Sequence, residues 1–149
     1  MGPDELVPVL EKVDLFSGLK PKLLRTIAES GQVETFAPDE VVIAEGEEVG
    51  GFRPFSQKGV EMHIVLDGGG GVSVSGESHG AVGPGDYFGE LSLLDGKPRS
   101  AEITAGEAGL TTFALTKWTF AELLEQHPEI ALPMLRVMVE RLRAAEHRH

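Results

Sequence analysis

Residues 85–101, with the sequence GDYFGELSLLDGKPRSA, combine a glycine turn, a helix start and one arginine. Gly85 and Gly89 can adopt backbone angles that other residues avoid, so the chain between them can turn sharply and direct amide hydrogens inward. Glu90–Leu94 is predicted to form one helical turn, whose first amides lack intrahelical acceptors. Arg99 adds a planar, permanently charged guanidinium that can make two parallel hydrogen bonds to a phosphate. Together these residues predict a binding site for an anion, and for a phosphate in particular.

Glu90 does not fit a site for inorganic phosphate, because its carboxylate would repel the anion. A carboxylate placed one sugar away from the phosphate can instead accept a hydrogen bond from a ribose hydroxyl, as an acidic residue does in dinucleotide sites. A plainer interpretation stays open for each feature taken alone: glycines often form only a turn, an arginine is often solvated, and a glutamate at a helix start often pairs only with the dipole. The three features in this order favour a ribonucleotide.

The segment FGELSLLDGKPRSA resembles the phosphate-binding cassette of the cyclic nucleotide-binding domain family. That family includes catabolite activator proteins, regulatory subunits of cyclic AMP-dependent kinase and cyclic nucleotide-gated channels. The resemblance extends from about Leu10 to about Leu142, and its diagnostic positions fall on Gly89, Glu90 and Arg99. It implies that Glu90 accepts a hydrogen bond from the ribose 2'-hydroxyl and that Arg99 pairs with the cyclic phosphate.

The resemblance also implies the rest of the ligand site. The amides of Leu91 and Ser92 complete the phosphate cradle, and Ser100 stands where the family has a small residue. A hydroxyl there can reach the phosphate or the base, so cyclic AMP and cyclic GMP both stay open, with cyclic AMP expected as the family's commoner ligand. The predicted ligand-binding residues are Phe88, Gly89, Glu90, Leu91, Ser92, Arg99, Ser100 and Ala101. No catalytic residue, metal or cofactor is expected.

The composition is that of one folded domain spanning residues 1–149, with 41% hydrophobic residues spread along the chain. The absence of cysteine excludes disulfides, thiolate metal sites and a cysteine nucleophile. The sequence has no apolar run of membrane-spanning length and no signal-peptide pattern, so a cytoplasmic location is expected. A formal net charge of -11 argues against nucleic-acid binding. It also requires the site for an anionic nucleotide to be locally positive.

Hydrophobic spacing predicts helices at both ends of the chain and strands between them. The segments with helical periodicity are 4–15, 21–30, 117–126 and 129–147. The short β-rich segments are Val33–Phe36, Val41–Ala44, Met62–Leu66, Val72–Val74, Gly80–Val82, Ala101–Thr104 and Leu110–Leu115. This order predicts a mainly β protein, a jelly-roll-like barrel over 32–116 with flanking helices in 1–31 and 117–149. The resemblance implies the same fold, the cyclic nucleotide-binding β-roll with its cassette at 85–101.

Two glycine-rich segments interrupt the predicted strands. VGGFRPFSQK at 49–58 is predicted to be an insertion, because its glycines and proline disfavour a regular strand. Its Phe52 and Phe55 fit either a hairpin tip anchored on the domain's own surface or a loop that covers the ligand or binds a partner. Gly68–Gly71 is predicted to form a flexible hairpin turn, and it lacks the lysine of a nucleoside-triphosphate loop.

Three functional classes follow from these features. The first is a regulatory domain in which cyclic nucleotide binding draws the cassette inward and moves the C-terminal helices. The second is an interaction or dimerisation module with a structural cassette, whose partner is an effector protein or a second copy bound at the apolar stripe of the last helix. The third, phosphodiester hydrolysis by Asp86 and Asp95 with a metal, is disfavoured because the sequence has neither His-Glu-x-x-His spacing nor a nucleophile elbow. We therefore expect no enzyme. The residue that caps the base stays open among Trp118, Met134, Arg136 and Met138.

Overall fold

The computed structural model describes residues 1–44, 61–90, 94 and 101–147. They form two compact units, a helical unit from Met1–Ser30 and Phe120–His149 and a sheet unit from Gly31–Thr119. The insertion predicted at 49–58 lies outside the described residues.

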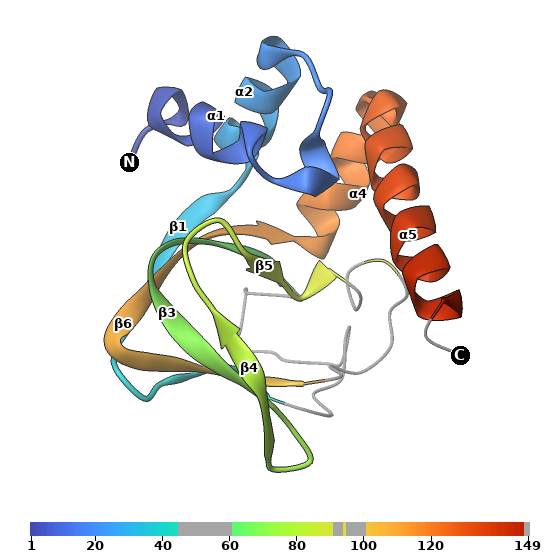
Figure 1. Cartoon of the computed structure of the whole chain (residues 1–149). Coiled ribbons are helices and arrows are strands. Elements are labelled where there is room, and N and C mark those ends of the chain that lie inside the picture. Colours follow the sequence, from blue (N-terminus) through green and yellow to red (C-terminus); the bar gives the residue numbers. More distant parts are fainter. Residues whose placement is uncertain (45–60, 91–93, 95–100, 148–149) are drawn as a thin grey trace. The chain divides into compact units, whose positions relative to one another are not determined.

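The N-terminal part of the helical unit contains α1 (Pro3–Glu11), the 3-10 turn η1 (Asp14–Phe16) and α2 (Pro21–Ser30) (Figure 1). Each α-helix begins with a proline, whose fixed backbone angle suits a helix start and whose missing amide hydrogen is not needed there. Leu10 and Phe16 are buried, and α1 packs against α2. The predicted helices at 4–15 and 21–30 are therefore confirmed, the first one ending earlier and continuing as η1.

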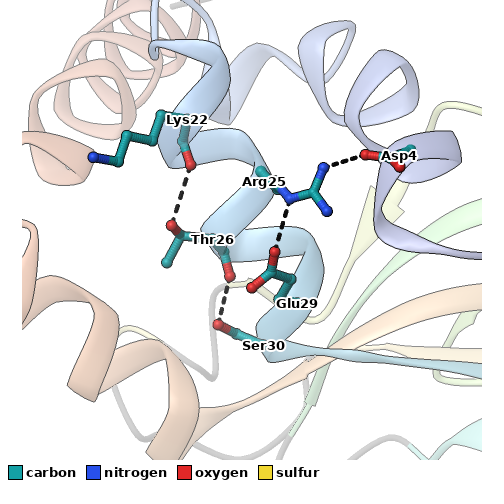
Figure 2. Close-up of polar contacts among 6 residues, drawn as sticks. All are labelled: Asp4, Lys22, Arg25, Thr26, Glu29 and Ser30. Carbon is teal, nitrogen blue, oxygen red and sulfur yellow. Dashed lines mark hydrogen bonds and ion pairs between the residues drawn. The ribbon is translucent and has the colours of Figure 1, made fainter.

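Polar contacts lie on the surface of α2 beside this packing (Figure 2). Arg25 donates a hydrogen bond from Nε to Glu29 at 2.9 Å, one turn along the helix, and pairs through Nη1 with Asp4 of α1. The hydroxyl of Ser30 donates to the carbonyl oxygen of Thr26 at 2.7 Å, which satisfies the side chain within the last turn. Arg25 therefore links the two helices at an exposed position.

The C-terminal part consists of α4 (Lys117–Gln126), the 3-10 turn η2 (Pro128–Ile130) and α5 (Ala131–Glu146). One side of α5 buries Met134 and Val137, and the helix packs against η1. A second row of apolar side chains on α5 is exposed, and it comprises Leu132, Leu135, Val139 and Leu142. The helices predicted at 117–126 and 129–147 are confirmed.

The sheet unit contains six antiparallel strands (Figure 1). The strands are β1 (Gln32–Phe36), β2 (Val41–Ile43), β3 (Glu61–Val74), β4 (Glu77–Val82), β5 (Tyr87–Phe88) and β6 (Glu102–Thr116). The order along the sheet is β1-β6-β3-β4, with β2 also paired to β6 and β5 to β3. The predicted mainly β fold with flanking helices is confirmed. Four of the predicted strands are merged in pairs, because β3 and β6 are long strands that continue through their glycines.

The hairpin turn predicted at Gly68–Gly71 is wrong. These glycines lie inside β3 and face β6, and the register shifts on both sides of Gly68. Gly68 has φ +75°, and a Cβ atom there would lie 2.2 Å from the carbonyl oxygen of Gly109. Glycine is therefore needed for the close approach of two bent strands. The real turn between β3 and β4 is Ser75–Gly76, where both residues have positive φ as a two-residue hairpin turn of this kind requires.

The interior of the sheet unit contains a hydrophobic cluster to which all six strands contribute. Its buried members are Ile43, Val65, Phe88, Ile103, Ala105 and Leu110, and the partly buried Phe36, Val42, Val72 and Val82 pack against them. Phe88 belongs to the segment for which the sequence predicted a ligand site. Packing in this cluster therefore holds Phe88, the first predicted contact residue, in place.

Candidate nucleotide-binding site

The candidate site begins at a tight turn that is held onto β3. The amide of Gly85 donates to the carbonyl oxygen of Val65 at 2.9 Å, and the amide of Val65 donates to that of Asp86 at 2.8 Å. Within the turn, the side chain of Asp86 accepts a hydrogen bond from the amide of Gly83 at 2.8 Å. Gly85 has φ +92°, so the backbone needs glycine at this position. The turn delivers β5 to the edge of β3 in a fixed register.

β5 is only two residues long, and it is followed at once by the predicted contact residues. Phe88 is paired with His63 across the ladder and is 6% exposed. Gly89 has φ +87°, as the sequence predicted for a sharp change of chain direction. Glu90 follows in helical conformation and is only 9% exposed. A glutamate that merely balanced a helix dipole would be expected in solvent, so this burial favours a more specific role.

The described residues include half of the predicted ligand-contact set. Phe88, Gly89 and Glu90 are consecutive at the end of β5, and Ala101 precedes β6. Leu94 is helical and exposed, consistent with the predicted helical turn. Leu91, Ser92, Arg99 and Ser100 lie outside the described residues. The predicted meeting of Arg99 with Glu90 therefore stays a prediction.

The sequence did not single out the aromatic contacts behind Phe88. The ring of His63 stacks on Phe88 with 5.0 Å between centroids and 19° between planes. Phe36 of β1 also contacts His63. The centroids of their two rings are 5.8 Å apart, and the rings meet edge to face. His63 is 3% exposed. Its position two residues before Val65 in an apolar strand is the signal that could have marked it as an interior residue.

Asp86 was weighed as one of two carboxylates for metal-assisted hydrolysis. Its side chain closes the turn after β4 and is exposed. This contact gives Asp86 a structural task in positioning β5. Asp95, the other carboxylate of that hypothesis, lies outside the described residues.

Comparison with known proteins identifies the family. The family described as Cyclic nucleotide-binding domain matches residues 33–127, which include all of α4 and all but the first two residues of the sheet unit. The chain therefore belongs to the cyclic nucleotide-binding domain family, as the cassette predicted. Among the described residues, every helix is too short or too polar to cross a lipid bilayer.

Two curated relatives and one solved structure illustrate the similarity. A cyclic nucleotide-gated potassium channel of Mesorhizobium japonicum is 32% identical over 133 residues, covering 89% of this chain and 34% of the channel. A CRP-like cAMP-activated global transcriptional regulator of Mycobacterium tuberculosis is 28% identical over 144 residues, covering 91% and 58%. The N-terminal domain of a Streptomyces coelicolor transcriptional regulator has a TM-score of 0.76 and 27% identity, covering 95% and 94%. The chain thus spans between a third and three fifths of these curated relatives.

Proposed function

We propose that this chain is a receptor domain for cyclic AMP, with its site in the cassette at 85–101. The observation that carries the proposal is Glu90, a carboxylate that is 9% exposed and follows directly on the left-handed Gly89. In this site Glu90 accepts the ribose 2'-hydroxyl, and the amides of Leu91 and Ser92 bind the phosphate together with Arg99. Phe88, Ser100 and Ala101 complete the contacts.

The charge of the chain sets a condition on this site. The formal net charge of -11 repels an anionic nucleotide at long range, so binding depends on local positive groups. Arg99 and the helix-start amides supply them. We favour cyclic AMP over cyclic GMP as the ligand, because the Mycobacterium tuberculosis relative is a cAMP-activated protein.

Ligand binding is proposed to act on α5. A ligand shifts a conformational equilibrium only by the difference between its affinities for the two states, so the bound cassette must favour one arrangement of the C-terminal helices. We place this single regulatory domain, residues 1–149, in the cytoplasm. Because the chain has no cysteine, its folding does not require an oxidising compartment. We expect no catalysis, and cyclic AMP should stay intact during long incubation with magnesium or manganese.

Titration calorimetry tests the ligand. Cyclic AMP should bind at one site per chain, and 5'-AMP, which lacks the cyclic phosphodiester, should bind more weakly. Glu90→Gln should weaken cyclic AMP binding by about 1.5 to 3 kcal/mol, or roughly ten- to hundredfold, because it removes a charged acceptor. Arg99→Ala should weaken binding at least as much. Glu77→Gln on the exposed surface of β4 is the matched control and should leave binding unchanged.

The ligand offers a second control for the role of Glu90. If Glu90 accepts from the 2'-hydroxyl, the losses caused by Glu90→Gln and by 2'-deoxy cyclic AMP should not add, since both remove the same hydrogen bond. Additive losses would contradict the assigned role while leaving the ligand in place. An absence of heat with either cyclic nucleotide at millimolar concentration would overturn the whole proposal.

A second candidate function is self-association through α5. The exposed Leu132, Leu135, Val139 and Leu142 recur at intervals of three and four residues, the spacing of a coiled-coil seam. Sedimentation velocity with and without cyclic AMP would detect a dimer. Leu135→Ser should weaken that dimer, whereas Glu140→Gln, at an exposed position of the same helix outside the seam, should not. A monomer under both conditions would discard this candidate.

A further inference from the structure

A second group of polar side chains lies inside the sheet unit, on the strands next to the cassette. Glu34 of β1 and Thr112 of β6 are directly paired, and Thr112 also pairs with Val65 of β3. Antiparallel partners project to the same face, and side chains two residues apart on one strand share a face. His63 and Glu61 therefore lie on the same interior face as Glu34 and Thr112.

The ligand atoms of three of these side chains converge. One carboxylate oxygen of Glu34, one of Glu61 and one ring nitrogen of His63 all lie within 4.8 Å of one another. His63 is 3% exposed and the side chain of Glu34 is 9% exposed. Nδ1 of His63 lies 4.0 Å from Oε2 of Glu34 and 2.9 Å from Oγ1 of Thr112. The nitrogen edge of the ring thus faces the oxygen atoms of the neighbouring strands.

This set of donors has a defined chemical preference. Two carboxylates and one imidazole suit a first-row divalent ion such as Zn²⁺ or Mn²⁺, while Mg²⁺ and Ca²⁺ prefer all-oxygen sites. Zinc binds nitrogen and oxygen at about 2.0 to 2.2 Å, so its ligand atoms lie roughly 3.4 Å apart in a tetrahedral site. The ligand atoms, which lie up to 4.8 Å apart, would have to approach one another by at most about 1.4 Å to reach that separation.

The electrostatics of the cluster also favour a dication. Two ionised carboxylates close together and removed from water repel each other, and a divalent ion offsets both charges at once. Each of the three residues also takes part in further interactions within the protein, so a bound metal would join contacts that already exist.

We propose that Glu34, Glu61 and His63 form a site for a first-row divalent metal, with Zn²⁺ as the occupant to be tested. The metal joins β1 to β3, two strands that both pair with β6. It also fixes the ring of His63, on which Phe88 stacks immediately before Gly89. The hydroxyl of Thr112 supplies a further oxygen beside the ring nitrogen. The site does not depend on the identity of the nucleotide.

Equilibrium dialysis of the chelator-treated full chain against Zn²⁺ alone measures the stoichiometry. The wild type should hold one ion in the interior, and Glu34→Gln and Glu61→Gln should each lower its affinity by more than about tenfold. Zn²⁺ should raise the thermal unfolding midpoint of the wild type, because a ligand of the folded state stabilises it. Glu34→Gln, which keeps the size of the side chain, should abolish that rise.

Surface histidines need their own controls. Nδ1 of His127 lies 3.7 Å from Oε1 of Glu129. This partly exposed pair could hold zinc adventitiously. His127→Gln and His147→Gln should leave the interior ion and the thermal shift unchanged. Visible absorption of bound Co²⁺ gives a second readout that Glu34→Gln should remove and His127→Gln should keep.

Two results would overturn the proposal. The first is zinc binding that survives Glu34→Gln and is lost in the surface histidine variants. The second is a folded wild type that takes up neither Zn²⁺ nor Co²⁺, which would mean that the interior charges are balanced within the protein.

Discussion

The interior of the sheet unit has two regions made from the same strands but with opposite chemistry. In the first region β3 and β6 contribute apolar side chains such as Val65, Ile103 and Leu110. In the second, the same two strands contribute His63, Glu61 and Thr112. The two regions share the pairing of β3 with β6, so they differ in the types of residue that these strands contribute. Burying polar groups costs free energy unless they are paired, so the polar region indicates a requirement other than packing.

Replacing a side chain in the apolar region should have the largest effect on stability. Leu110 is 2% exposed, and Leu110→Ala should lower the free energy of unfolding by about 2 to 5 kcal/mol, because it removes buried surface and leaves a cavity. Urea denaturation measures the change. Val33→Ala on β1, at a side chain that is 40% exposed, is the control and should cost much less. Equal losses in the two variants would remove the distinction between interior and surface.

Removing one hydroxyl from the polar region should have an intermediate effect on stability. Thr112 is fully buried, and Thr112→Val keeps its shape while removing the hydroxyl that bonds to His63. The free energy of unfolding should fall by about 1 to 3 kcal/mol, because a buried polar group loses its hydrogen bond. A Thr112→Val protein as stable as the wild type would mean that the polar region is not held by this contact.

The smallest effect is expected for similar polar groups at the surface. Arg25 bonds to Glu29 and pairs with Asp4, and these contacts raise its pKa, the hydrogen bond to Glu29 most of all. The pKa of an arginine is already strongly alkaline, and raising it further keeps the guanidinium charged around neutral pH. The titration of Arg25 therefore gives stability no pH dependence near neutrality. Arg25→Gln should leave the urea midpoint unchanged, because exposed pairs are screened by solvent. A loss as large as that of Thr112→Val would contradict the contrast between interior and surface.

Local patterns predicted the parts of this molecule that depend on near neighbours. The helices followed from apolar spacing, and the positive φ of Gly85 and Gly89 followed from the turn that the cassette needs. Gly68 was misjudged because its glycine neighbours look like a turn, while its real constraint is the backbone of Gly109 on another strand. The group of Glu34, Glu61 and His63 could not be found in the sequence. Glu34 lies on β1, whereas Glu61 and His63 lie on β3, and only the pairing of both strands with β6 brings the three residues together.

The order of the two units along the chain has a consequence for synthesis. The sheet unit is the continuous segment Gly31–Thr119, whereas the helical unit joins Met1–Ser30 to a segment that begins at Phe120. The strands therefore emerge from the ribosome before α5 does. Until α5 emerges, the apolar side chains of η1 lack the helix they pack against. The nascent chain carries this exposed surface throughout the time taken to make the strands, and it is there that a chaperone would bind.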